Sequence, residues 1–173
     1  MVLTAVIILI LVALDRAAKI VAEGLLVGKG AVEFIPNILG FRLLENGNTG
    51  AAFGLFSGGT VVLSVVTFIV VALLLYVLFF KKFSSKLLRA AVILITAGGI
   101  GNLYDRIVYG AVTDFLEFRF MSFPIFNVAD CFVTIGCGLM LLYILISPKN
   151  EPVFVKETEA TDTDKEKNND EQL

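Results

Sequence analysis

Two aspartates, Asp114 and Asp130, are the residues of this chain whose type and surroundings best suit chemistry. The first lies in the run Val-Thr-Asp-Phe at 112–115 and the second in Phe-Asn-Val-Ala-Asp at 126–130, so both have apolar neighbours. Two carboxylates brought together in poor solvent cannot easily both ionise, and one tends to hold a proton while the other stays a base. Such a pair can activate water to hydrolyse a peptide bond, and this chemistry needs neither a metal nor a cofactor.

The absence of histidine narrows the choice of chemistry. Without imidazole, Ser-His-Asp and Cys-His nucleophiles and zinc motifs of the HExxH type are excluded. A Ser-Lys pair lacks a serine with an evident place beside Lys19. Cys131 and Cys137 are six residues apart in one predicted helix, so they face different directions, and we interpret them as packing residues. A net charge of -2 gives no sign of a nucleic-acid partner.

The elements that position the aspartates are predicted to be membrane helices. Of the 173 residues 57% are hydrophobic, and the mean hydropathy of +0.88 exceeds what one soluble domain of this length could bury. About 20 apolar residues span the hydrocarbon as a helix, which predicts a mainly α membrane protein with four transmembrane helices. The stretches are 2–14 (extendable to 21), 60–80, 87–103 and 128–146. A cleaved secretory signal is an alternative for the first stretch, although a basic start and a small-residue cleavage site are missing.

Charge predicts the orientation of these helices. A basic cluster lies between the second and third stretches and should keep that loop cytoplasmic, with both termini on the same side. Its members are Lys81, Lys82, Lys86 and Arg89. After Pro148 the composition becomes polar and acidic, so we expect a membrane domain at 1–148 and a disordered cytoplasmic tail at 149–173.

With this topology, the polar residues that are costly in a membrane protein gather on the outer side. Asp15 and Lys19 share a helix face at i and i+4, as either an ion pair or participants in chemistry. The outer segment, about 22–57, contains a plausible strand at 41–44 and a tight turn at Asn46-Gly47. Asn48 follows that turn, and it serves either the geometry of the loop or a hydrogen bond to substrate.

Asn102, Asp105 and Arg106 fall on one face at the end of the third stretch. Asp105 and Arg106 either anchor the helix at the membrane interface or belong to a site. The preceding glycines, at 98, 99 and 101, are interpreted as allowing close helix packing rather than forming a phosphate loop.

The second outer loop, about 107–126, contains an alternating run at 111–120 that predicts a half-buried strand. Asp114 then lies on its apolar face, whereas Glu117 and Arg119 lie on the wetter one, so Asp114 breaks the binary pattern. Asn127 and Asp130 match a capping box at the start of the fourth helix. That role is compatible with chemistry, because a capped helix start would hold Asp130 rigidly.

The order and spacing of four motifs resemble those of the lipoprotein signal peptidases, also called signal peptidase II. The motifs are 48–53, 101–106, 112–115 and 126–130, and the resemblance covers roughly residues 10–146. It implies a bacterial inner-membrane aspartic endopeptidase with four helices and a small extracytoplasmic β element. Such an enzyme removes the signal peptide of a prolipoprotein just before its diacylglyceryl-modified cysteine, and the antibiotic globomycin targets this family.

The resemblance also implies roles for individual residues. Asp114 and Asp130 are the expected catalytic pair, acting near the outer face of a membrane-bound monomer without a cofactor or metal. The expected substrate-binding or site-ordering residues are Asn48, Gly50, Asn102, Asp105, Arg106, Asn127, Asp15 and Lys19. Arg16 and Ala18 depart from the family's first-helix motif, which usually reads Asp-Gln-x-Ser/Thr-Lys. A proton- or ion-coupled transporter and a noncatalytic scaffold are the competing classes, but the internal repeats and midplane polar residues of a transporter are missing.

Overall fold

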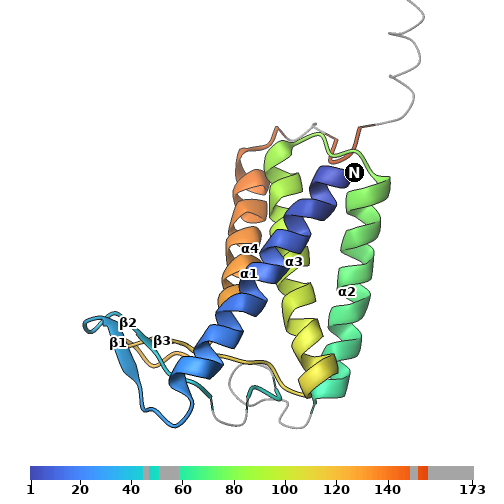
Figure 1. Ribbon diagram of the computed structural model, residues 1–173. Coiled ribbons are helices and arrows are strands. Elements are labelled where there is room, and N and C mark those ends of the chain that lie inside the picture. The colour runs from blue at the N-terminus through green and yellow to red at the C-terminus, as the bar shows by residue number, and fades with distance from the viewer. Residues whose placement is uncertain (45–46, 51–58, 149–151, 156–173) are drawn as a thin grey trace, which may run out of the picture.

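Four helices form a bundle that carries a small sheet at one end (Figure 1). The computed structural model describes residues 1–44, 47–50, 59–148 and 152–155. The helices are α1 (Val2–Leu26), α2 (Thr60–Phe80), α3 (Lys86–Tyr109) and α4 (Val128–Ile146). The strands β1 (Val32–Ile35), β2 (Leu39–Phe41) and β3 (Leu116–Phe118) form an antiparallel sheet in the order β1-β2-β3. The predicted fold class, a mainly helical membrane protein with a small β element, is confirmed.

The bundle has the apolar exterior of a protein that contacts lipid. Among the described residues, α2, α3 and α4 are long and apolar enough to cross a membrane. Phe68 of α2 and Leu145 of α4 leave 60% and 74% of their surface exposed, which would be costly in water. The N-terminal half of α1 is similarly apolar, whereas its C-terminal half carries charged residues that point into the bundle.

Close packing between helices depends on glycine. A Cβ atom on Gly101 of α3 would lie 2.6 Å from the carboxylate of Asp15, and one on Gly136 of α4 would lie 2.8 Å from the carbonyl oxygen of Ala91. A Cβ on Gly98 would collide with the carbonyl oxygen of Ala129. The interpretation of the glycine run as a helix-packing surface is therefore confirmed.

Two helices extend beyond the predicted stretches. The third helix continues to Tyr109 and ends at Gly110, whose φ of 75° is the left-handed conformation that suits glycine at a helix end. Asp105 and Arg106 are therefore within the last turns of α3. The first helix likewise continues to Leu26, because Asp15 and Lys19 are satisfied by partners inside the bundle and do not interrupt the helix.

The predicted strands are only partly correct. The run 111–120 pairs regularly over Leu116–Phe118 alone, and the alternation fails upstream because Asp114 and the adjacent Phe115 are both buried. β2 covers Leu39–Phe41 rather than 41–44, and β1 was not predicted. Asn46 of the predicted turn and positions 51–53 of the first motif lie outside the described residues. Gly47 has a left-handed φ of 63°, as a tight turn requires.

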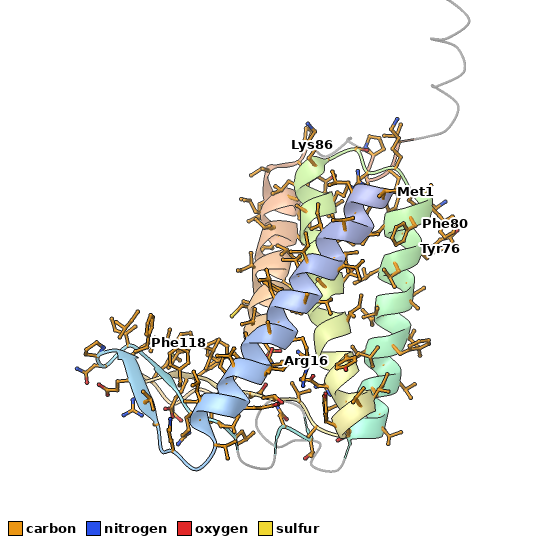
Figure 2. All side chains as sticks on the ribbon, in the orientation of Figure 1. Met1, Arg16, Tyr76, Phe80, Lys86 and Phe118 are labelled. Atoms are coloured by element: carbon orange, nitrogen blue, oxygen red, sulfur yellow. The ribbon has the colours of Figure 1, made fainter. Side chains whose placement is uncertain are left out.

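The two ends of the bundle differ in character. Met1 and Lys86 lie at one end, whereas Phe118 and the sheet lie at the other (Figure 2). At the first end, residues 152–155 pair with the α2–α3 loop through an isolated bridge between Phe83 and Phe154. Residues 152–155, which belong to the predicted tail at 149–173, therefore contact the bundle.

Candidate active site

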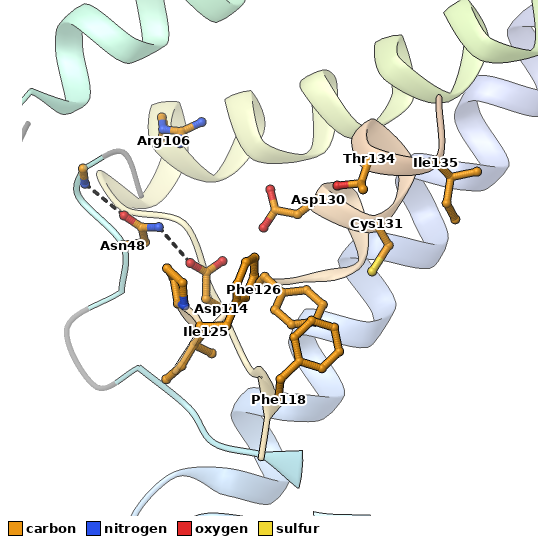
Figure 3. Close-up of a pocket in the computed structure, with 13 residues that line it drawn as sticks. Asn48, Arg106, Asp114, Phe118, Ile125, Phe126, Asp130, Cys131, Thr134 and Ile135 are labelled. Atoms are coloured by element: carbon orange, nitrogen blue, oxygen red, sulfur yellow. Dashed lines mark hydrogen bonds between the residues drawn. The ribbon is translucent and has the colours of Figure 1, made fainter. Parts of the chain in front are cut away.

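Polar side chains from segments far apart in the sequence meet at the sheet end of the bundle. Asp114, which lies between α3 and β3, and Asp130, in the first turn of α4, line one cavity of about 460 Å³ (Figure 3). Asn48, Gly50 and Arg106 also line it, and Phe118, Phe123 and Phe126 form an aromatic wall. The convergence that the motif order predicted is therefore present.

Asn48 aims its amide nitrogen at Asp114. Its backbone pairs with Val112 through hydrogen bonds of 2.7 and 3.0 Å, which fixes the position of the residue. Its side-chain oxygen accepts a hydrogen bond from the amide of Gly50 at 3.0 Å, so the NH₂ group is left to donate to Oδ2 of Asp114 at 2.9 Å. The sequence left loop geometry and a hydrogen bond to substrate as alternatives for Asn48; its backbone serves the loop, and its NH₂ group donates to Asp114.

Asn127 is oriented in the same way by the start of α4. Its side-chain oxygen accepts from the backbone N–H of Asp130, and Oδ2 of Asp130 accepts from the backbone N–H of Asn127, so the predicted capping box is confirmed. The Asn127 NH₂ group then donates to Oδ1 of Asp114 at 2.6 Å and to Oδ1 of Asn102 at 3.1 Å. Asn127 therefore contacts both carboxylates, that of Asp114 through its side-chain NH₂ group and that of Asp130 through its backbone N–H.

Asn102 aims its amide nitrogen at Asp130. Its oxygen accepts from the ammonium of Lys19 at 3.2 Å and from Asn127, and its NH₂ group donates to Oδ1 of Asp130 at 2.8 Å. Lysine can only donate, so Lys19 decides which way this amide points. Each of the three asparagines thus has its oxygen held by a donor and its nitrogen directed to a carboxylate.

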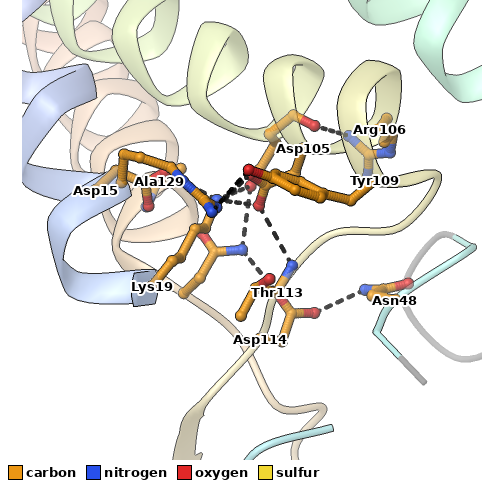
Figure 4. A network of polar contacts seen from close by, with 12 residues as sticks. Asp15, Lys19, Asn48, Asp105, Arg106, Tyr109, Thr113, Asp114 and Ala129 are labelled. Atoms are coloured by element: carbon orange, nitrogen blue, oxygen red, sulfur yellow. Dashed lines mark hydrogen bonds and ion pairs between the residues drawn. The ribbon is translucent and has the colours of Figure 1, made fainter. Parts of the chain in front are cut away.

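A buried ionic network lies behind these amides (Figure 4). Lys19 is fully buried and pairs with Asp15 and Asp105, each at 2.8 Å, while Arg16 pairs with Asp105 at 3.2 Å. The expected Asp15–Lys19 ion pair is present. Two acids and two bases balance one another, and a buried pair that lost one partner would be costly. Asp15 also accepts from the backbone N–H of Ala129 at 2.8 Å, which ties α1 to the start of α4.

Asp105 and Arg106 differ in surroundings despite their shared helix turn. Asp105 is fully buried against α1, so the alternative that it anchors the helix at the membrane interface is wrong. It also accepts from the backbone N–H of Thr113 at 3.3 Å, next to Asp114. Arg106 lines the cavity with both aspartates, and its buried Nε–H has no hydrogen-bond partner among the described residues.

The environment of Asp114 favours its protonated form. The pKa of Asp114 is raised to about 6, chiefly by burial and also by the nearby Asp130 carboxylate, and the hydrogen bonds from Asn48 and Asn127 oppose this increase. Lys19 lowers the pKa of Asp114 least. A carboxyl that titrates near neutrality can exchange protons during a reaction, as acid–base chemistry requires.

The sequence did not predict the contacts of Glu23 and Arg16 or the aromatic wall. Glu23 accepts a hydrogen bond from the hydroxyl of Thr113 at 2.7 Å, and Arg16 donates to the hydroxyl of Tyr109 at 3.0 Å as well as to Asp105. Glu23 follows Asp15 and Lys19 at further spacings of four residues, a pattern that could have revealed it. The aromatic wall gave no such signal, because its members come from a strand and a loop without a fixed period.

Two carboxylates that line one cavity of a helical membrane protein, held by neutral amides, are typical of a membrane-embedded aspartic endopeptidase. The particular family follows from comparison with known proteins. The chain matches the family model described as signal peptidase (SPase) II over residues 7–146, and it belongs to this family of bacterial multi-pass membrane proteins. The family consists of aspartic endopeptidases that remove signal peptides from prolipoproteins, which decides against the transporter and the scaffold.

Curated relatives and solved structures agree with this assignment. The chain is 36% identical over 135 residues to the lipoprotein signal peptidase of Clostridium novyi, covering 76% of this chain and 90% of that protein. It is 40% identical over 144 residues to the lipoprotein signal peptidase of Shouchella clausii, covering 83% and 93%. A bacterial membrane enzyme solved by the in meso method at 2.3 Å resolution superposes with a TM-score of 0.75 at 28% identity, covering 90% of this chain and 96% of that one. A second such enzyme structure, at 1.9 Å, gives a TM-score of 0.74 at 29% identity, covering 86% and 96%.

Proposed function

We propose that Asp114 and Asp130 are the catalytic pair of this signal peptidase II, and that it cleaves prolipoproteins just before a diacylglyceryl-modified cysteine. The observation that carries the catalytic assignment is that both carboxylates line one cavity and both accept hydrogen bonds from Asn127, one from its side chain and one from its backbone. The burial of Asp114 supports a pair that shares one proton.

In the proposed reaction, the ionised aspartate takes a proton from a water molecule while the water oxygen attacks the scissile carbonyl carbon. The protonated aspartate donates its proton to the departing amine as the C–N bond breaks. The guanidinium of Arg106, which lines the cavity with both aspartates, is suited to stabilise the developing oxyanion. Asn48, Asn102 and Asn127 hold the two carboxylates in position without adding a fixed charge.

Two apolar surfaces beside Asp130 support a lipidated substrate. One is the aromatic wall, which continues to Ile135 of α4. The other is a cavity of about 300 Å³ between α2 and the α3–α4 pair, which also reaches Asn102, Arg106 and Asp130. Its apolar lining includes Val66, Val70, Leu74, Ile95 and Val133. A substrate with both an apolar signal helix and acyl chains presents two apolar parts close to the scissile bond, which matches two apolar surfaces that meet at one carboxylate.

The same proposal includes an orientation in the membrane. The basic α2–α3 loop faces the cytoplasm, with both termini on that side, and the aspartates lie near the outer face. In support, Met1 and residues 152–155 lie at the loop end, and the sheet lies at the other (Figure 1).

The deciding experiment is cleavage of a purified diacylglyceryl-modified prolipoprotein in detergent, with the unlipidated precursor alongside. Wild type is expected to cleave only the lipidated form, and Asp114→Asn and Asp130→Asn are expected to lose cleavage because an amide cannot exchange a proton. Glu33→Gln, which removes an exposed acid on the sheet, is the matched control and should retain activity. Turnover at the wild-type rate in either aspartate variant would remove that residue from the pair, and equal cleavage of both precursors would remove the lipid requirement.

A further inference from the structure

A second cavity of about 460 Å³ lies at the end of the bundle opposite the aspartates, where α2 ends and α3 begins. Its lining combines basic side chains with apolar ones: Lys81, Lys82, Lys86 and Arg89, with Phe79 and Phe83. Figure 2 shows Lys86 at this end, far from Phe118 and the sheet. The peptidase chemistry does not use this cavity.

The positive charge around the cavity is not compensated within the described part of the chain. Among the described residues, the acidic side chains all lie toward the sheet end of the bundle. They are on the C-terminal half of α1, at or beyond Asp105 of α3, on the sheet, and at the start of α4. The ion pairs of the described residues involve none of the three lysines. Arg89 donates to the hydroxyl of Thr4, a neutral partner. Cations gathered around a cavity without acids attract an anion.

The loop that carries the lysines is held in one arrangement. The backbone N–H of Val155 donates to the carbonyl of Lys82 at 2.9 Å, and the N–H of Ser84 donates to the carbonyl of Val153 at 3.2 Å. The rings of Phe83 and Phe154 contact each other with centroids 5.4 Å apart. A preordered loop loses less conformational entropy when it binds a ligand.

The depth of the cavity indicates the kind of anion. It lies where the apolar helices end, which is the level of lipid headgroups. Phe80, which also lines the cavity, stacks with Tyr76 of α2 with ring centroids 5.2 Å apart, and both are exposed, as aromatic side chains are at membrane interfaces (Figure 2). We propose that this cavity binds the phosphate headgroup of an anionic phospholipid, with the acyl chains along the exposed face of α2.

The test uses the full chain in detergent, titrated with phosphatidylglycerol or with zwitterionic phosphatidylcholine, and native mass spectrometry to count the lipid molecules retained. We expect one phosphatidylglycerol to be retained in preference to phosphatidylcholine. Lys82→Gln and Lys86→Gln should each weaken its retention about fivefold, the usual contribution of one basic residue near an anionic headgroup. Lys29→Gln, which removes an exposed lysine at the sheet end, is the matched control and should change nothing.

Several outcomes would overturn the proposal. Equal retention of the two lipids, or an equal loss with Lys29→Gln, would mean that the cavity is not the site. Displacement of the lipid by excess inorganic phosphate would indicate a site for the free anion. The acidic residues after Val155 are the other candidate occupant, so a full-length variant with Glu157→Gln, Glu159→Gln, Asp162→Asn and Asp164→Asn is included. If only that variant retained phosphatidylglycerol, the chain's own tail would be the ligand.

Discussion

Replacing Asn48 with alanine should move the alkaline limb of the pH–rate profile upward. The active form of an aspartate pair keeps one proton, so kcat/KM falls as rising pH removes it. Since the pKa of Asp114 is about 6, the wild-type limb is expected near that pH. The Asn48 amide donates to the Asp114 carboxylate at 2.9 Å and, of the groups that lower the pKa of Asp114, has the largest effect. Its loss destabilises the ionised form and favours the protonated one.

The size of the shift follows from the hydrogen bond that is lost. A hydrogen bond to a charged group contributes about 1.5–3 kcal/mol, and one pKa unit corresponds to about 1.4 kcal/mol. Water entering the cavity replaces part of that bond, so we expect an upward shift of about one pH unit. The fold should survive, because Asn48 pairs with Val112 through backbone atoms that alanine retains.

The assay is kcat/KM for cleavage of the lipidated precursor across the pH range, with the apparent pKa assigned to the pair rather than to one residue. Asn48→Asp should shift the limb further upward, because it places a like charge beside Asp114. Thr49→Ala is the matched control, since the contact of Thr49 with Thr60 uses its backbone oxygen. A limb that stays in place or moves downward in Asn48→Ala would refute the idea that this amide stabilises the ionised pair.

Three further predictions concern stability. Lys19→Met leaves buried Asp15 without its cationic partner and Asp105 with Arg16 alone, so we expect a loss of about 3–5 kcal/mol, seen as a lower unfolding temperature in detergent; an unchanged unfolding temperature would contradict the ionic network. Gly98→Ala should destabilise the α3–α4 contact by more than about 1 kcal/mol because its Cβ collides with α4, whereas Gly138→Ala has open space and should not; equal effects would rule out the packing explanation. The pKa of Asp114 is raised in the folded protein, so its contribution to stability is complete below pH 3.8 and is lost as the pH rises to about 6, on the order of 3 kcal/mol. Asp114→Asn should therefore abolish that part of the pH dependence of thermal unfolding, and an identical pH dependence in both proteins would show that Asp114 does not cause it.

The helices could be predicted from sequence because each one depends on local composition. Apolar stretches near the length of a membrane span located α2 and α4 at both ends and the starts of α1 and α3 to within one residue, and the Asn127–Asp130 capping box was visible as a four-residue pattern. The ends of α1 and α3 were missed for the same reason. Charged residues normally end an apolar stretch, but Lys19 and Asp105 neutralise each other inside the bundle.

The bounds of the strands and the ordering contacts could not be predicted, because their causes are not local. β2 pairs with β3 across more than 70 positions, and the alternation at 111–120 predicted too long a strand because Asp114 and Phe115 are both buried. The spacing of Glu23 from Asp15 and Lys19 places it on the same helix face, but its partner, the Thr113 hydroxyl, is 90 positions away and cannot be read from that spacing. The motifs identified which residues gather, whereas the direction of each side chain depends on distant partners.

The choice of neutral amides around the aspartates has a physical reason. A cation in direct contact with both carboxylates would keep both ionised, and no proton would remain for the leaving amine. Lys19 instead contacts Asn102, whose amide passes a single hydrogen bond on to Asp130, and the charge of Lys19 is balanced by Asp15 and Asp105. The lysine therefore fixes the direction of the amide while affecting the protonation of Asp114 only weakly, which is consistent with its being the smallest influence on that pKa. A buried ionic network can in this way order an acid–base pair and still leave it free to hold a proton.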